Sequence, residues 1–190
     1  MALDKTGTLT SGQIEVTNIS VFAQREVSSL LPGALALEER STHPIAAAIA
    51  RHARRAGAAP VELDAFSMVP GSGLRATIGG EPALVGTLEF VSPSLSDARR
   101  REVIDEIEAI REAGGISAVF ALGDDALVFA LADQPRPGAR EFIKRLHEAG
   151  VERIAILTGD SRVIAENLAA DLGVDEVHAG LLPEEKVAHL

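Results

Sequence analysis

Cysteine is absent from the 190 residues of the chain. Without thiols the protein can have no disulfide framework and no thiolate metal site, which fits a reducing compartment. The longest apolar runs, among them residues 45–50 and 126–132, fall far short of the roughly 20 residues that cross a bilayer. No basic lead followed by an apolar stretch opens the sequence, so no signal peptide is predicted. We therefore expect a soluble segment in the cytoplasm.

Positive charge and aromatic rings are also scarce. Lysine and arginine total 18 against 28 aspartates and glutamates, which gives a formal net charge of −10. Nucleic acids and anionic membrane surfaces attract basic proteins, so neither is expected as a partner. The chain has six phenylalanines and no tryptophan or tyrosine, which argues against stacking on single-stranded nucleic acid. A polyphosphate ligand would have to be held locally, by backbone amides, a few cations and Mg²⁺.

Apolar residues, by contrast, are plentiful, since 46% of the chain is hydrophobic and 24% is charged. Such a chain is globular and long enough for one large domain or two small ones. From about residue 129 the pattern alternates between strand and helix, which predicts a parallel α/β half-domain. Strands are expected at 128–132, 153–157 and 176–179, helices at 140–149, 163–172 and from Pro183, and a first strand of the same sheet at 1–3.

A different pattern fills residues 15–128. Short strands follow one another with tight turns at 78–81 and 122–125, which indicates an antiparallel sheet. Strands are expected at 15–21, 61–69, 74–78, 83–86, 116–121 and 126–131, and helices at 25–39, 44–56 and 97–113. The predicted fold class is α/β: an incomplete Rossmann-like domain, residues 1–14 and 129–190, with an inserted α+β antiparallel-sheet domain, residues 15–128.

The heptad Asp4-Lys5-Thr6-Gly7-Thr8-Leu9-Thr10 places a carboxylate where the first strand should end. An aspartate there can attack a phosphoryl group while the following backbone N–H groups hold its oxygens. A phosphatase of this design needs a second carboxylate two positions on, to act as acid and then as base. Thr6 stands there and cannot readily activate water, so a phosphate on Asp4 should persist. The alternative is a plain turn, which the first four residues alone would fit.

This heptad resembles the phosphorylation motif of P-type ATPases, ion pumps that pass through an aspartyl phosphate. The resemblance implies a phosphorylation domain of the haloacid-dehalogenase type, with a nucleotide-binding domain inserted after the nucleophile. It assigns Asp4, Lys5 and Thr6 to the catalytic site. It also implies Mg²⁺, bound by the Asp4 carboxylate and the Thr6 carbonyl.

Two downstream segments fit the same family. Thr158-Gly159-Asp160 follows an apolar strand and opens a helix, where an α/β sheet binds its ligand. Alone it would be an ordinary helix N-cap, but in the family the matching segment contacts the phosphoryl group. Leu182-Pro183-Glu184-Glu185-Lys186 resembles the segment whose lysine, here Lys186, neutralises charge between the aspartate and the phosphate. Without this resemblance Lys186 would be a solvated surface residue.

The inserted domain contains Ser41-Thr42-His43-Pro44, which opens a helix with Pro44 in its first turn and with Ser41 or Thr42 as its cap. The alternative for His43 is a surface residue of that cap. However, His43-Pro44 resembles the nucleotide site of the heavy-metal-transporting branch of P-type ATPases.

Three further segments extend this resemblance: Glu38 upstream, Gly71-Ser72-Gly73, and Gly86. It implies that ATP binds with its adenine stacked on or hydrogen-bonded to His43. Glu38 would accept a hydrogen bond from the exocyclic amine, and the glycines would let backbone approach the nucleotide.

The chain also departs from the family pattern. Thr87 stands where many copper-transporting members have Asn after the glycine, and Ser161 replaces the Asn that often follows Thr-Gly-Asp, although Ser161 should still cap the helix. Residues 133–137 fit the hinge where the inserted domain returns. The sequence stops at Leu190, before the family's Gly-Asp-Gly-x-Asn-Asp segment, so Asp4 and Thr6 form an incomplete Mg²⁺ site.

The expected parent is a metal-transporting P-type ATPase of the cell membrane, in which the γ-phosphate of ATP reaches across the hinge to Asp4. Transmembrane helices outside this chain would bind the metal. The chain alone should bind ATP or ADP weakly and be phosphorylated little. The alternatives are a free-standing phosphatase of the same fold class and a non-catalytic nucleotide-binding module. Thr42 before His43, and residues 181–187, resemble zinc, cadmium or cobalt members more than copper ones.

Overall fold

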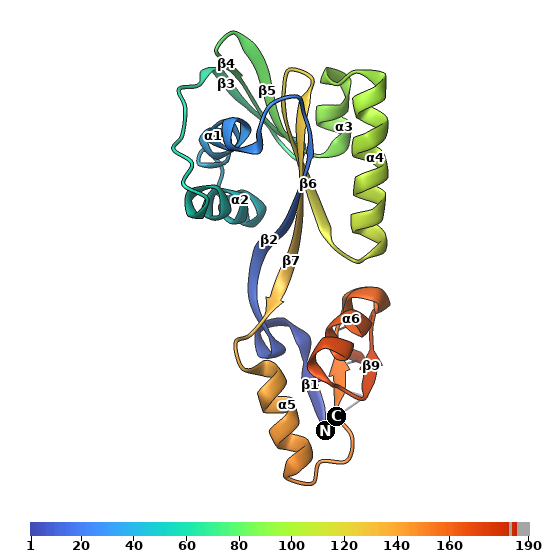
Figure 1. Ribbon diagram of the computed structural model, residues 1–190. Coiled ribbons are helices and arrows are strands. Elements are labelled where there is room, and N and C mark those ends of the chain that lie inside the picture. The colour runs from blue at the N-terminus through green and yellow to red at the C-terminus, as the bar shows by residue number, and fades with distance from the viewer. Residues whose placement is uncertain (183, 186–190) are drawn as a thin grey trace. The chain divides into compact units, whose positions relative to one another are not determined.

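The computed structural model describes residues 1–182 and 184–185, whose helices and strands are drawn in Figure 1. They form two compact units. The parallel-sheet unit consists of Met1–Gln13, Glu112–Gly114 and the residues from Asp133 on, and the antiparallel-sheet unit consists of Ile14–Arg111 and Gly115–Ala132. The domain borders predicted from the sequence, between residues 14 and 15 and between residues 128 and 129, stay predictions.

Three short strands form the centre of the parallel-sheet unit: β1 (Ala2–Asp4), β8 (Ala155–Leu157) and β9 (Glu176–His178). They are hydrogen-bonded in the order β1-β8-β9, and both pairs are parallel. Asp4 lies opposite Leu157, and Leu157 lies opposite His178, so the carboxyl ends of all three strands meet at one edge. The predicted parallel α/β fold is confirmed. The strand expected in it at 128–132 belongs instead to the antiparallel sheet, because a continuous apolar run is typical of a strand buried on both faces in either kind of sheet.

Two helices pack with this sheet, α5 (Ala139–Glu148) and α6 (Arg162–Leu172). Their apolar residues and those of the strands form one core, which includes Leu3, Ile143, Ile154, Ile156, Ala169 and Leu172. Gly173 ends α6 with a φ of 79°, the left-handed conformation that favours glycine at this position. The helix predicted from Pro183 starts at a residue outside those described.

The antiparallel-sheet unit contains a six-stranded sheet in the order β2-β7-β6-β5-β4-β3. The strands are β2 (Thr10–Phe22), β3 (Asp64–Val69), β4 (Gly73–Ile78), β5 (Glu81–Gly86), β6 (Ile116–Leu122) and β7 (Asp125–Pro135). The helices are α1 (Val27–Glu38), α2 (Pro44–Arg55), α3 (Leu88–Val91) and α4 (Asp97–Glu112). Figure 1 shows α1 and α2 on one face of the sheet and α3 and α4 on the other.

Two further details differ from the prediction. The start of β2 at Thr10, not residue 15, was missed because Gly12, with a φ of 70°, and its polar neighbours have the composition of a turn. Helix α3 was missed because its four residues are too few for a helical period to show. Thr87 caps this helix, since its Oγ1 accepts a hydrogen bond from the Phe90 N–H at 3.4 Å.

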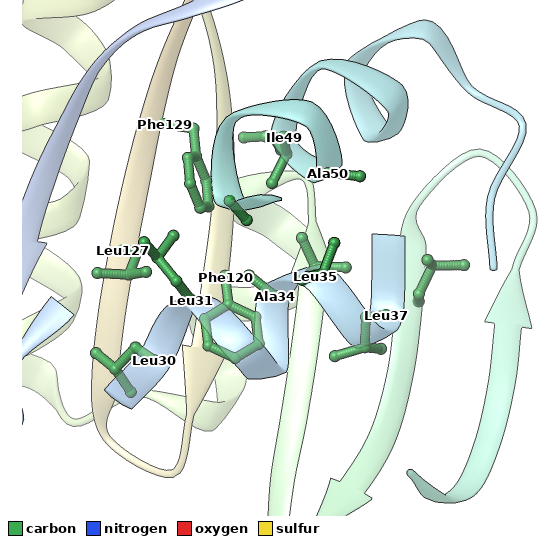
Figure 2. Close-up of a cluster of buried hydrophobic side chains, with 14 of the residues drawn as sticks. Leu30, Leu31, Ala34, Leu35, Leu37, Ile49, Ala50, Phe120, Leu127 and Phe129 are labelled. Atoms are coloured by element: carbon green, nitrogen blue, oxygen red, sulfur yellow. The ribbon is translucent and has the colours of Figure 1, made fainter. Parts of the chain in front are cut away.

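Coverage of both sheet faces explains why residues 118–122 and 126–131 are almost continuously apolar. Ala118, Phe120 and Leu122 belong to the core beneath α1 and α2, whereas Val119 and Ala121 belong to the core that contains residues of α4. Alternate side chains of one strand therefore enter different cores, as the two-residue period of a strand requires. Figure 2 shows Phe120, Leu127 and Phe129 packed against residues of α1 and α2.

Helix α1 approaches the sheet most closely at Gly33. A Cβ atom at this position would lie 2.9 Å from Cζ of Phe120 and 3.0 Å from Cδ1 of Ile78. The absence of a side chain thus lets the helix rest directly on the sheet. This packing fixes the distance between the sheet and α1, the helix that ends at Glu38.

Phe120 provides a test of this core, because it is fully buried while Phe66 of the same sheet is 39% exposed. We expect Phe120→Ala to lower the free energy of unfolding by about 3–5 kcal/mol, since it leaves a cavity. Phe66→Ala should change it by less than about 1 kcal/mol. Urea denaturation followed by circular dichroism measures both, and equal losses would contradict the placement of Phe120.

Candidate functional site

Asp4 ends β1 directly before a reversal of the chain at Lys5–Leu9. Thr6 has φ −76° and ψ 123°, and Gly7 has φ 78° and ψ −9°. These are the central angles of a type II β-turn, which needs a positive φ at its third residue and therefore favours glycine there. The turn places Asp4 at the tip of the strand, where the sequence predicts it. Thr6 is exposed.

Lys5 is buried, with 6% of its surface exposed, and its Nζ forms an ion pair with Oδ2 of Asp160. An ammonium group removed from water needs an opposite charge nearby, because its desolvation is costly. The pair joins the turn after β1 to the segment after β8. It thereby brings two of the predicted catalytic segments together at the carboxyl edge of the sheet.

Thr158 follows β8 at the same edge and is 1% exposed. Its Oγ1 accepts a hydrogen bond from the Asp160 N–H at 3.1 Å, and its own N–H donates to the His178 carbonyl at 3.0 Å. The N–H groups of Gly180 and Leu181 donate to the carbonyls of Asp160, at 2.8 Å, and Thr158, at 3.0 Å. The predicted phosphate-binding turn is therefore held by the backbone after β9.

Ser161 is the N-cap residue of α6, as expected, but it makes no side-chain cap, since its hydroxyl accepts no capping hydrogen bond. The side-chain bond in this turn comes instead from Thr158, two residues before the Asp160 N–H. Gly159 lies between them, and a Cβ atom there would lie 3.3 Å from the Leu181 carbonyl oxygen.

The segment Asp133–Arg136 holds the turn after Asp4 from the other side, a role that the sequence reasoning missed. The Thr10 hydroxyl donates to Oδ2 of Asp133 at 2.5 Å. The Arg136 N–H donates to the Leu9 carbonyl at 2.8 Å, and its guanidinium donates to the Gly7 carbonyl at 2.7 Å. We call these contacts the return brace. The available signal was topological, since a chain that returns from an insertion must pass near its point of departure.

Asp4 and Thr6 supply carboxylate and carbonyl oxygens of the kind that Mg²⁺ binds. Within residues 1–182 and 184–185, however, no group of three or more His, Cys, Asp or Glu side chains could hold a metal ion. The Mg²⁺ site at Asp4 and Thr6 therefore stays a prediction. Lys186, the predicted charge-neutralising lysine, lies outside the described residues.

The antiparallel-sheet unit contains a cleft of about 420 Å³ at the ends of α1, β4 and β5. Five of the predicted nucleotide-site residues line it: Glu38, His43, Gly71, Gly73 and Gly86. Pro44 begins α2 and is not among the lining residues. Met68 and Ser117 line the cleft too and had no motif to reveal them, because β3 and β6 are brought there only by the order of the sheet.

The glycines of the cleft serve two physical roles. Gly71 has a φ of 74°, and a Cβ atom there would meet open space. Gly73 and Gly86 are instead paired across β4 and β5, where a Cβ atom on either would lie 2.2 Å from a backbone oxygen of the opposite strand. These two glycines are therefore required by the close approach of the strands themselves.

His43, not Ser41 or Thr42, is the N-cap of α2. Its Nδ1 accepts a hydrogen bond from the Ile45 N–H at 3.2 Å, and its own N–H donates to the Ser41 hydroxyl at 3.1 Å. A nitrogen that accepts a hydrogen bond carries no proton, so this geometry assigns the ring proton to Nε2. The exposed imidazole can therefore cap the helix and still donate from Nε2.

Glu38, the last residue of α1, is buried in the wall of the cleft with 6% of its surface exposed. Burial alone raises the pKa of its carboxyl group from the ordinary value of 4.5 to about 7. A carboxylate loses hydration in such a place, so the neutral acid is favoured. The described residues therefore place a carboxyl group that titrates near neutrality beside His43.

A second hollow of the surface is lined by none of the predicted site residues. A shallow groove of about 730 Å³ runs along α5 and includes Arg140, Lys144 and His147. Among the helices that the structure describes, none has the length and apolar character to cross a membrane.

Comparison with known proteins agrees with this geometry. The sequence profile of the haloacid dehalogenase-like hydrolases matches residues 1–190. The chain is 39% identical over 185 residues to the copper-exporting P-type ATPase B of Archaeoglobus fulgidus, an alignment that covers 96% of this chain and 26% of that protein. The chain thus spans about a quarter of the length of this relative.

Solved structures give the same picture. A zinc-transporting PIB-type ATPase matches with a TM-score of 0.84 and 36% identity, over 99% of this chain and 30% of that one. The catalytic domain of the CPx-ATPase CopB-B, studied for its conformational changes upon nucleotide binding, matches with a TM-score of 0.66 and 26% identity, over 99% and 65%.

Glu38 makes stability depend on pH. Because the folded chain holds the Glu38 proton more tightly than the unfolded chain, the free energy of unfolding falls as the pH rises from 4.5 to about 7 and then levels off. We expect Glu38→Gln to raise it by about 1–3 kcal/mol at pH 8, with a smaller gain towards pH 5. Urea denaturation across this pH range measures the effect.

The matched control is Glu39→Gln, because the neighbouring Glu39 side chain is paired with Arg54. This variant should show no gain that grows with pH. A Glu38→Gln difference that stays constant from pH 5 to pH 8 would contradict the burial of an ionisable carboxyl group in the cleft.

Proposed function

Because the chain belongs to the haloacid dehalogenase-like hydrolase family, we propose that it forms the ATP-binding and phosphoryl-accepting region of a heavy-metal-transporting P-type ATPase. The observation that carries this proposal is the pairing of two sites in one chain. Asp4 lies at the carboxyl edge of a parallel sheet beside the Lys5–Asp160 pair, and a separate cleft is lined by Glu38 and His43.

The reaction proposed is transfer of the γ-phosphoryl group of ATP to Asp4. A carboxylate oxygen of Asp4 forms a bond to the γ-phosphorus as the bond from that phosphorus to the bridging oxygen breaks, and ADP leaves with the electron pair. The hydroxyls of Thr6 and Thr158 can donate to the phosphoryl oxygens, and Lys186 would supply positive charge. Lys5, already neutralised by Asp160, positions the turn between them.

The nucleotide would bind in the cleft of the antiparallel-sheet unit. The Nε2–H of His43 can donate to the base or its ring can stack on it, and Glu38 lies in the wall of the same cleft. No atom lies within 4 Å of the Cβ position that Gly71 lacks, so the nucleotide can approach the backbone there. Mg²⁺, held in part by Asp4 and Thr6, would supply further neutralisation of phosphate charge.

In the parent protein, the phosphoenzyme would drive a heavy-metal cation across the cell membrane, with the metal bound by transmembrane segments outside this chain and this segment in the cytoplasm. The relatives reported above are named for copper and for zinc at similar identities. We propose zinc, cadmium or cobalt as the transported metal, because the sequence at residues 41–44 and 181–187 resembles members that transport these metals.

A second candidate, a phosphatase that hydrolyses small phosphoesters, is favoured only by the family's general description as hydrolases. Thr6 opposes it, because a threonine cannot readily activate water against an aspartyl phosphate. A nucleotide-binding module without catalysis is the remaining alternative.

The test of the nucleotide site uses two variants of His43. His43→Asn keeps a good N-cap for α2 and removes the imidazole, whereas His43→Ala removes both. We expect isothermal titration calorimetry with ATP to show an affinity about tenfold lower for both variants, since each lacks the ring contact. Only His43→Ala should also lower thermal stability.

His52→Ala serves as the control, because His52 lies on α2 but not in the cleft. It should bind ATP as the parent chain does. Unchanged affinity in His43→Asn would contradict a role of the imidazole in binding the base.

The phosphatase alternative has its own measurement. We expect no steady release of p-nitrophenol from p-nitrophenyl phosphate by the parent chain, because Thr6 occupies the acid–base position. Turnover that disappears in Asp4→Asn would support the phosphatase and overturn the assignment of Asp4 to a persistent phosphoenzyme.

A further inference from the structure

The Glu38 carboxyl group occupies a position that suits an uncharged acid. It is 6% exposed and lies in a cleft whose wall includes the apolar side chains of Leu74, Val85 and Ala118. Among the described residues it makes no hydrogen bond and no ion pair. Such surroundings favour the neutral form of the carboxyl group.

The charged groups on the neighbouring elements are engaged with partners other than Glu38. Of the residues that line the cleft, only Glu38 and His43 can titrate. Next to them, Glu39 of α1 is paired with Arg54 of α2, and Arg75 of β4 donates to Ser67. Burial is the cause of the raised pKa of Glu38.

The two forms of a carboxyl group suit different bases. The pairing edge of adenine offers an acceptor at N1 and a donor at N6. A carboxylic acid has one donor and one acceptor and can satisfy both at once, whereas a carboxylate has only acceptors and would face the N1 lone pair. The pairing edge of guanine offers donors at N1 and N2, which suit the carboxylate instead.

We propose that Glu38 reads adenine as the carboxylic acid, donating its O–H to N1 and accepting from the N6 amine. Nucleotide binding then takes up a proton, and the acid form selects adenine over guanine. This inference rests on the proposed function, because it requires that the cleft hold the base of ATP. It adds a donated hydrogen bond and a dependence on pH to that site.

Glu38→Gln separates this mechanism from simple acceptance by a carboxylate. A glutamine amide offers the same donor and acceptor at every pH. We divide the dissociation constant of ATP from the unsubstituted chain by that from Glu38→Gln. This ratio should rise about tenfold between pH 6.5 and pH 8.5. Both proteins keep every other ionisable group of the cleft and bind the same ATP, so effects of pH on those groups cancel in this ratio. Glu39→Gln should behave as the parent chain does.

A second measurement needs no variant. At pH 6.5, 1-deaza-ATP lacks the N1 acceptor and should bind the parent chain about fivefold more weakly than ATP, while 3-deaza-ATP should bind like ATP. GTP should bind weakly at pH 6.5 and gain on ATP as the pH rises. Titrations in buffers of different ionisation enthalpy should show proton uptake at pH 8 in the parent chain and less in Glu38→Gln.

A ratio that stays constant with pH, or 1-deaza-ATP binding like ATP, would overturn the inference while leaving the nucleotide site standing. Failure of ATP to bind the parent chain at any pH would overturn both the inference and the proposed function. The rising ratio together with weak binding of 1-deaza-ATP supports it.

Discussion

The parallel pairing of β1 with β8 is the constraint on which the rest of the chain depends. Ala2 lies opposite Ala155, and the Ala155 N–H donates to the Met1 carbonyl at 2.8 Å. The chain between β1 and β8 must therefore leave this sheet and return to it at neighbouring points. The return brace marks those points, where Thr10 meets Asp133. The antiparallel-sheet unit can therefore form its own hydrophobic cores, while the β1–β8 pairing holds Asp4 at the end of β1.

Buried charge is handled differently at the two sites. Lys5 is neutralised by a partner, Asp160, so a cation can remain next to Asp4 although its side chain is buried. Glu38 has no such partner among the described residues and is neutralised by holding its proton. The charge of Glu38 therefore changes near neutral pH.

The strand and helix pattern, the parallel sheet and the position of Asp4 follow from local sequence, because apolar period and turn composition are local properties. The cap by His43 and the mutual contact of Gly73 and Gly86 could not be predicted, since they depend on which atoms approach after folding. Met68 and Ser117 likewise enter the cleft through sheet order alone. The motifs contain five of the residues that line the cleft, but they did not reveal the physical role of each.

Strand β7 pairs with β6 from Asp125 to Leu131 between two apolar layers. Its central amide protons can meet deuterated solvent only when the whole antiparallel-sheet unit opens, so they should be among the slowest to exchange. The same strand continues to Pro135 and so includes Asp133 of the return brace. The backbone that is slowest to open thus runs without interruption into the segment that holds the turn after Asp4.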